Sequence, residues 1–237
     1  MTEYNKKILA RRNKMFNVNN SSNINNLFFD EILNNIKEDY YILDIGTGTG
    51  YVLNQIYNNI NKVHLFGNDN SPVMLDEAKK RCPFANFVLC DNYNLDFDSN
   101  SFDMVVAKNV TRFSAREIYR ILKPGGIFIY REYGKGKGFR EIAQLFKERL
   151  IRSRCKSFYV NKLKEAGFDI KKSFYCYSTK NYSIQEIIDI IKSYPFIKDF
   201  NLEDEHFLKK HFAEKVHITA DPFLIVAVKG GENENRK

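Results

Sequence analysis

Residues 41–50 read YILDIGTGTG, a short apolar run that ends in three glycines separated by threonines. Glycine allows a tight turn, and it lets a ligand approach the backbone where a Cβ atom would clash. A dinucleotide-binding fingerprint, G-x-G-x-x-G, would need its third glycine at position 51, where the chain has Tyr51. The pattern is instead D-x-G-x-G-x-G, with Asp44 two residues before the first glycine. The stretch predicts a buried strand followed by a ligand-binding turn.

Similar apolar runs recur along the chain at helix-length intervals, at residues 41–45, 63–67, 87–90, 104–107 and 127–130. They do not alternate with polar residues, which is typical of parallel strands buried on both faces. Helix signals stand between them: Ser71-Pro72 begins a helix that runs to about Arg81, and a capping-box pattern at 114–117 begins another. This alternation predicts a doubly wound α/β sheet, whose ligands bind beyond the carboxyl ends of the strands.

The flanks of this region are predicted to be mostly helical. An Asn-rich stretch at 13–26 indicates a loop or mobile flap, and apolar residues at helical spacing follow up to residue 36. Beyond Tyr130 we expect a helix at about 139–151, a shorter helix that ends at Gly167, and a strand at 168–178. A second capping box at 183–186 begins a helix, another helix is expected at 202–214, and the last strand at 222–229.

If the strands at 168–178 and 222–229 are neighbours in the sheet, the residues between them are an insertion, and a mostly helical one. The chain then divides into four parts: residues 1–38 as an N-terminal flap and helix, 39–178 as the cofactor-binding core, 179–220 as the insertion, and 221–237 as the last strand and a frayed tail.

Four further motifs follow the glycine turn in order. Asp69 ends the second apolar run, in GND, and Asp91 follows the third, in LCDN. SFDMVVAKN at 101–109 contains the fourth run, and LKPGG at 122–126 precedes the fifth. With these motifs, residues 40–130 resemble the class I S-adenosylmethionine-dependent methyltransferases, most closely those that act on small molecules.

The resemblance implies a Rossmann-like, mostly parallel sheet of seven strands, and S-adenosylmethionine as the cofactor. In that family the acid that corresponds to Asp69 accepts hydrogen bonds from the ribose hydroxyls. Asp91 would contact the adenine amino group, and Asn92 would offer a backbone N–H to the ring. The cofactor-binding residues so implied are Asp44, Gly46, Thr47, Gly48, Gly50, Asp69, Asn70, Asp91, Asn92 and Lys108.

Each motif also has a plain structural interpretation. The three glycines could form only a tight turn, and Asp69 could be an acid near the start of a helix. Asp91 lies in a polar loop with Asn92, Asn94 and Asp96, so the choice of Asp91 within that loop stays open.

The catalytic residues are unknown from sequence. A sulfonium methyl group is already activated, so direct in-line transfer needs positioning and no covalent intermediate. Lys108, Asn109, Glu132 and Tyr133 follow the fourth and fifth strands and are the candidates, although a role as surface polar residues stays open for the residues after the fifth strand. The Pro-Pro-aromatic tetrad of nucleobase and amide N-methylating members is absent at 108–111, which read KNVT, and that strand has no Pro-Cys nucleophile.

The insertion suggests a small-molecule acceptor, because family members of that kind cover the acceptor with extra helices. Its aromatic side chains are predicted either to line such a pocket or to pack against the sheet. They are Tyr182, Tyr194, Phe196, Phe200, Phe207 and Phe212.

The net charge of +8 is concentrated in residues 131–172, which contain 13 Lys and Arg against five acids. An anionic acceptor and a solvated basic helix face both explain this, and the choice stays open. An RNA or protein acceptor that uses the same segment is a less favoured alternative. A non-catalytic, cofactor-binding partner subunit is the third.

Other features of the sequence restrict the setting. The four cysteines lack metal-ligand spacing and no His pairing accompanies them, so no metal site is expected. The first residues do not resemble a signal peptide, and no apolar run is long enough to span a bilayer, so we expect a cytoplasmic protein without membrane contact. The acceptor, the methylated atom (O, N, S or C), the need for a general base, the oligomeric state and the role of the Asn-rich segment are not predicted.

Overall fold

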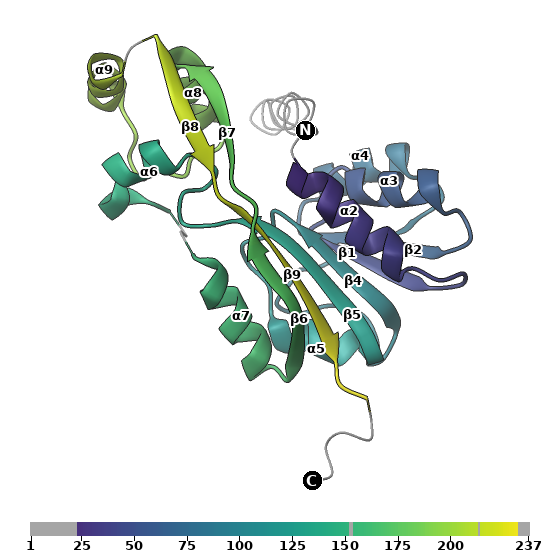
Figure 1. Ribbon diagram of the computed structural model, residues 1–237. Helices are drawn as coiled ribbons and strands as arrows, with labels where there is room; N and C mark the ends of the chain where they lie inside the picture. The colour runs from purple at the N-terminus through teal and green to yellow at the C-terminus, as the bar shows by residue number, and fades with distance from the viewer. Residues whose placement is uncertain (1–22, 152–153, 213, 232–237) are drawn as a thin grey trace.

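A seven-stranded sheet organises the computed structural model, which describes residues 23–151, 154–212 and 214–231 (Figure 1). The strand order is β3-β2-β1-β4-β5-β9-β6. Strands β1 to β5 are parallel, and β9 is antiparallel to both of its neighbours. The strands are β1 Tyr41–Ile45, β2 His64–Asp69, β3 Asn86–Leu89, β4 Phe102–Lys108, β5 Leu122–Tyr133, β6 Phe168–Tyr175 and β9 Pro222–Lys229. The predicted doubly wound, mostly parallel sheet is confirmed.

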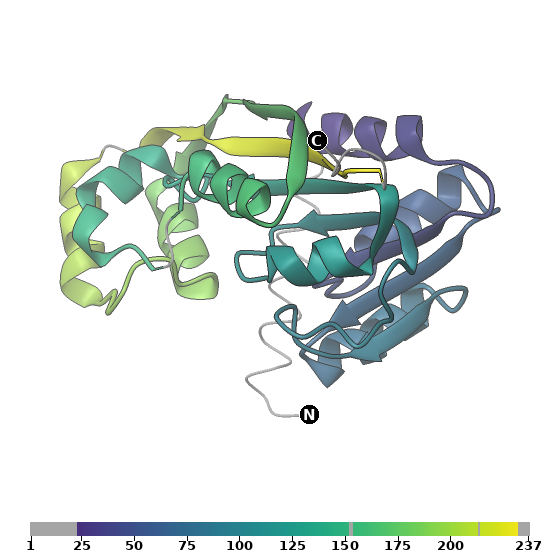
Figure 2. The same ribbon diagram turned by 90° about the horizontal axis from the view of Figure 1, so that it is seen from below.

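Helices cover both faces of this sheet, as Figure 2 shows from below. On one face lie α2 Asn23–Asn35, α3 Tyr51–Asn59 and α4 Pro72–Arg81, and on the other α5 Ala115–Ile121 and α7 Lys156–Glu165. Successive residues of β1 point to opposite faces: Ile42 packs in the cluster with α2 and α3, and Leu43 packs in the cluster with α5 and α7. Because both faces are buried, the strands lack polar alternation. Residues 1–22, with most of the Asn-rich stretch, lie outside the described part of the chain, as do 232–237.

The helix starts follow the sequence signals with one difference. Ser183 and Glu186 form the complete capping box that begins the helix after it. At α5, the Ser114 hydroxyl accepts from the Glu117 N–H (3.2 Å), but the Glu117 carboxylate accepts from the Leu95 N–H (3.1 Å) and pairs with Arg120. The second half of that capping box is therefore replaced by a contact that ties α5 to the loop after β3.

The insertion between β6 and β9 is less helical than expected. It contains the two expected helices, α8 Ile184–Ser193 and α9 Leu202–His211, but they are flanked by β7 Ser178–Ser183 and β8 Lys215–Ala220. These two strands pair antiparallel as a separate sheet. β7 reads STKNYS, and four of its residues are exposed, so no hydrophobic period marks it as a strand. β8 runs on into β9 in Figure 1.

The insertion also forms a hydrophobic core of its own, together with α6 Arg140–Leu145. The helix expected at 139–151 breaks here into α6 and a 3₁₀ turn at Lys147–Arg149. Four of the insertion aromatics pack in this second core and not against the main sheet: Tyr182, Phe196, Phe200 and Phe212. Tyr194 and Phe207 are exposed. We call α6, α8, α9, β7 and β8 the small unit; it lies beyond one end of the main sheet (Figures 1 and 2).

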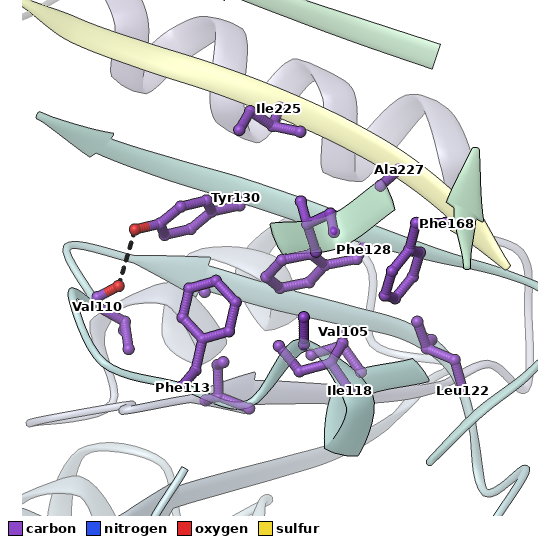
Figure 3. Close-up of a cluster of buried hydrophobic side chains, with 14 of the residues drawn as sticks. Val105, Val110, Phe113, Ile118, Leu122, Phe128, Tyr130, Phe168, Ile225 and Ala227 are labelled. Carbon is purple, nitrogen blue, oxygen red and sulfur yellow. Dashed lines mark hydrogen bonds between the residues drawn. The ribbon is translucent and has the colours of Figure 1, made fainter. Parts of the chain in front are cut away.

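A cluster of buried aromatic side chains lies on the face of the sheet that α5 and α7 cover (Figure 3). Phe113, Phe128 and Tyr130 pack edge to face or stacked, with centroids 5.2 to 5.8 Å apart. The buried Tyr130 hydroxyl donates to the Val110 carbonyl oxygen (2.8 Å). This bond holds the loop after β4, so the position of Val110 is set by the core and not by the loop alone.

Among the described residues, no helix combines the length and the apolar character that crossing a membrane requires.

Candidate functional site

The glycine turn joins β1 to α3 and has a strongly constrained backbone. Gly46, Gly48 and Gly50 have φ angles of +62°, +56° and +77°, a region that L side chains rarely adopt. A Cβ atom on Gly46 would lie 2.9 Å from the Val110 side chain, but one on Gly48 would meet nothing within 4 Å. The first glycine is therefore required by packing, and the second borders open space that a ligand can use.

Asp69 lies against this turn, as expected from its place at the end of β2. Its carboxylate accepts from the backbone N–H groups of Gly48 and Ser71, both at 3.0 Å. Each carboxylate oxygen can accept more than one hydrogen bond, so capacity remains for hydroxyl donors. The next predicted residue, Asn70, is exposed just beyond the strand.

Three buried oxygens around the turn have no hydrogen-bond partner: Asp44 Oδ2, Thr47 Oγ1 and Asn68 Oδ1. Buried polar atoms are rarely left unpaired, so this cluster fits a ligand that brings N–H or O–H donors. Burial raises the pKa of Asp44 from 3.8 to about 7, although the Thr47 side chain and, less strongly, the charge of Lys108 act in the opposite direction. A site that keeps a carboxyl group at this energetic disadvantage is suited to a cationic ligand.

Asn68 was missed by the sequence analysis. Its side-chain amide donates to Asn92 Oδ1 (2.8 Å) and to the Cys90 carbonyl (3.3 Å), which joins the ends of β2 and β3. The only signal was a polar residue inside a buried apolar run, directly before the Asp69 that drew attention.

The loop after β3 exposes the Asp91 side chain to solvent and holds the Asn92 side chain partly buried. Asp91 is exposed, and its Oδ1 accepts from the Tyr93 N–H (2.8 Å) in a local turn. The Asn92 carbonyl accepts from the Ser114 N–H (2.9 Å), and its amide donates to the Arg112 carbonyl (3.4 Å). Asn92 is thus fixed next to the turn, where Gly46 lies close to its side chain.

Lys108 ends β4 on the same face as Asp44, as the alternation of buried residues along both strands shows. Its ammonium lies 5.2 Å from the centre of the Tyr51 ring. Burial and the nearby Arg131 charge lower the pKa of Lys108 to about 7, although Asp44 and Glu132 act in the opposite direction. At neutral pH this side chain can therefore hold or release a proton.

Arg131, Glu132 and Tyr133 lie within β5, so the expectation that these residues follow the strand is wrong. Arg131 and Glu132 are 1% and 2% exposed, so their interpretation as surface polar groups is wrong. Arg131 donates to the Asn109 side chain and stacks over the Tyr133 ring, 4.2 Å from its centre. Asn109 has a φ of +61°, and its N–H donates to the Arg131 carbonyl (2.9 Å). Arg131 thereby contacts two of the catalytic candidates, Asn109 and Tyr133, and holds them in place.

Glu132 lies on the opposite face of β5 from Arg131, because successive strand residues point to opposite faces. Its Oε1 accepts from the Tyr133 N–H (2.7 Å), and its buried Oε2 has no partner. Burial raises the pKa of Glu132, so the carboxyl group retains a proton at a higher pH than an ordinary glutamate.

A second glycine-rich loop, GKGKG at 134–138, follows β5 and was not singled out in the sequence. Gly136 and Gly138 donate their N–H groups to the Asp221 carboxylate at 2.7 and 3.0 Å. Asp221 is 5% exposed and stands between β8 and β9. The loop therefore binds the protein's own carboxylate at the junction of the main sheet and the small unit.

Comparison with known proteins assigns this architecture to a class. Residues 42–126 match the family model described as a methyltransferase domain. The fold is that of the class I methyltransferases: a methyltransferase from Bacillus halodurans, designated putative, superimposes with a TM-score of 0.66 at 18% identity, over 86% of this chain and 98% of that chain. Residues 42–126 are therefore similar to a methyltransferase domain, and the chain has the class I methyltransferase fold.

Individual relatives match different shares of this chain. The ubiquinone/menaquinone biosynthesis C-methyltransferase of Desulfotalea psychrophila is 38% identical over 95 residues, which are 36% of this chain and 38% of that enzyme. Phosphoethanolamine N-methyltransferase 2 of Haemonchus contortus, solved with S-adenosyl-L-methionine, superimposes with a TM-score of 0.55 at 22% identity, over 86% of this chain and 52% of that chain. The chain aligns with less than half the length of the curated relatives that it matches.

Proposed function

We propose that this protein is an S-adenosylmethionine-dependent methyltransferase that acts on a small-molecule acceptor. The observation that carries the proposal is the glycine turn itself: an open Gly48, the Asp69 carboxylate against it, and three buried oxygens without partners. The relatives support the choice of cofactor and acceptor, because one was solved with S-adenosyl-L-methionine and others are named as quinone or sterol methyltransferases.

In this proposal the residues of the turn divide the cofactor between them. Asp69 accepts from the ribose hydroxyls, and Asn92 and Asp91 border the adenine. Asp44 and Thr47 offer their unpaired oxygens to the ammonium group of the methionine part. The bound cofactor supplies a methyl group on a sulfonium. The chain supplies position and a dry environment, which favour a reaction in which charge is lost from sulfur.

Two of the four predicted catalytic candidates suit proton transfer best. The Lys108 ammonium has a pKa of about 7, and Glu132 has a raised pKa and a buried, unpartnered Oε2. The neutral Lys108 amine can accept a proton from an acceptor near neutral pH, and the Glu132 carboxylate can accept one when it is ionised. Asn109 and Tyr133, which contact Arg131, are better suited to positioning. We propose Lys108 and Glu132 as the groups to test first.

Calorimetry with S-adenosylmethionine and S-adenosylhomocysteine tests the proposal. Asp69→Ala removes a charged acceptor of two hydroxyl donors, and affinity should fall about 100-fold, as expected for about 3 kcal/mol. Asp76→Ala on α4 is a matched control, because it removes the same charge from an exposed position. Absence of binding by the wild type, or equal affinities for the wild type and Asp69→Ala, would contradict the proposal.

An RNA acceptor makes a different prediction. Retention on RNA would weaken linearly in log K against log salt, because phosphate contacts release counterions. A protein that is not retained at low salt but methylates a small molecule excludes this alternative. Tight cofactor binding without turnover on a broad acceptor panel would instead favour the non-catalytic subunit.

A further inference from the structure

A cavity of about 570 Å³ lies at the junction between the main sheet and the small unit. It is bordered by the second glycine loop, by α6 and the turn after it, and by the end of β6. Its volume is in the range of small-molecule sites. Three residues of its lining, Lys135, Arg140 and Lys147, belong to the basic segment 131–172, for which the sequence left an anionic acceptor open.

The polar lining of this cavity is predominantly positive. Lys135, Arg140 and Lys147 border it against one acid, Asp221. Both oxygens of Asp221 accept backbone N–H groups of the glycine loop, and the charge of Arg140 also acts on this carboxylate. The charge of the lining therefore suits an anion.

The neighbouring acids do not cancel this charge. Glu148 lies 3.9 Å from Lys147, but both side chains are at least 75% exposed, and such pairs contribute little. Glu141 on α6 accepts from the Thr219 N–H (2.8 Å), so its carboxylate is engaged with β8.

Two tyrosines also border the cavity. Tyr175 and Tyr177 stack with centroids 5.4 Å apart, and Arg140 lies over the Tyr177 ring at 5.2 Å. The Tyr175 hydroxyl accepts from the Lys156 N–H (3.0 Å), which fixes the ring at the end of β6. Cations beside fixed aromatic rings suit an anionic group attached to an apolar or planar body.

The cavity is also close to the acceptor side of the proposed site. The glycine loop begins two residues after Glu132, and the Gly134 N–H donates to the backbone carbonyl (2.9 Å) of Asp221, which borders the cavity. A ligand in the cavity would thus lie beside the end of β5.

We propose that this junction cavity binds the phosphate group of a phosphomonoester, with the attached body against Tyr175 and Tyr177. Three cations match a dianion with three terminal oxygens better than a single carboxylate. As the acceptor's anionic subsite, the cavity rests on the proposed methyl transfer; as a phosphomonoester site, it stands on its own geometry.

Cys155 borders the same cavity and provides a direct readout. Alkylation of Cys155 by iodoacetamide is followed by peptide mass spectrometry, at constant ionic strength, with phenyl phosphate, inorganic phosphate, benzoate or phenol added. Phenyl phosphate at millimolar concentration should slow Cys155 alkylation at least about threefold by occupancy of the site. Cys90 in the same molecules serves as an internal control and should not change.

Variants identify the cations involved. Lys135→Gln combined with Arg140→Gln should abolish protection, measured within the variant, whereas Lys209→Gln with Lys210→Gln, an exposed pair on α9, should retain it. No protection by phenyl phosphate, or equal protection by benzoate or phenol, would overturn the proposal. Protection by inorganic phosphate alone would overturn the assignment to a phosphomonoester. A cofactor titration of the same protein separates these outcomes from failure of the methyltransferase proposal.

Discussion

The two glycine-rich loops of this protein have nearly the same pattern and opposite uses. GTGTG at 46–50 follows β1 and borders open space at Gly48, with buried oxygens left unpaired around it. GKGKG at 134–138 follows β5 and closes around Asp221, where a Cβ on Gly136 would lie 2.9 Å from the carboxylate. Alternating glycines therefore allow another group to lie close to the backbone. Whether that group belongs to a ligand or to the chain itself depends on the rest of the fold.

The largest expected effect is on the second loop. Asp221→Ala leaves the buried N–H groups of Gly136 and Gly138 without acceptors and should lower the free energy of unfolding by about 3 kcal/mol. Thermal denaturation measures this as a loss of about 10 °C in Tm. Asp221→Asn keeps one acceptor oxygen, so its free energy of unfolding should lie between those of the wild type and Asp221→Ala. Cofactor affinity should stay unchanged in both; a large loss of affinity would mean that the loops are coupled.

The next effect concerns the first loop and has the opposite sign. Because the pKa of Asp44 rises from 3.8 in the reference state to about 7 in the fold, the folded carboxyl holds a proton that the unfolded chain has lost. This destabilises the fold increasingly as pH rises from 3.8 to 7, and fully above that range. Asp44→Asn should therefore stabilise the ligand-free protein by about 2 kcal/mol near pH 8 and hardly at all near pH 4.

Urea denaturation at both pH values tests this. Near the higher pH, Lys108, with a pKa of about 7, is mostly neutral, so its charge hardly offsets that of Asp44. The same variant should bind S-adenosylmethionine more weakly. If the wild type and Asp44→Asn are equally stable at the higher pH, the ionised Asp44 carboxylate does not destabilise the fold, and the prediction is wrong.

A pair of glycine substitutions contrasts the loops directly. Gly48→Ala should lower cofactor affinity about tenfold and stability by about 1 kcal/mol, because its φ of +56° is strained but its Cβ meets no protein atom. Gly136→Ala should lower stability alone, because its Cβ would lie 2.5 Å from Arg140 Cγ. Calorimetry and thermal denaturation on both variants give the answer. Interchanged results would reverse the assignment of the two loops.

The smallest effect lies beside the second loop. The pKa of the Cys155 thiol is lowered first by its hydrogen bond with Ser157 and also by the charge of Lys135. Ser157→Ala should therefore raise this pKa more than Lys135→Gln, with stability changed by less than about 0.5 kcal/mol. The pH dependence of alkylation measures it, with Lys215→Gln as an exposed control. No change in either variant would remove Lys135 from the vicinity of the thiol.

The sheet and the cofactor side could be predicted because their signals are local. A buried parallel strand must be apolar throughout, and its terminal glycines and acids are adjacent in sequence, so residues 42–50 and Asp69 were identified with their places in the fold. The Asn68 contact was missed because its partner, Asn92, lies 24 residues further on, in the loop after β3. The ribbon of β7 and β8 was missed because β7 is polar and pairs with residues almost forty positions away.

The amino-acid sequence by itself determined the doubly wound sheet, the order of its strands' motifs and the turn beside Asp69, because hydrophobic pattern and glycine placement act over a few residues. Only the tertiary structure decided that Arg131 and Glu132 are buried, that the insertion packs on its own core, and that Asp221 fills the second glycine loop. Burial and charge pairing depend on segments far apart in the chain, and these meet only when the sheet and the small unit are assembled.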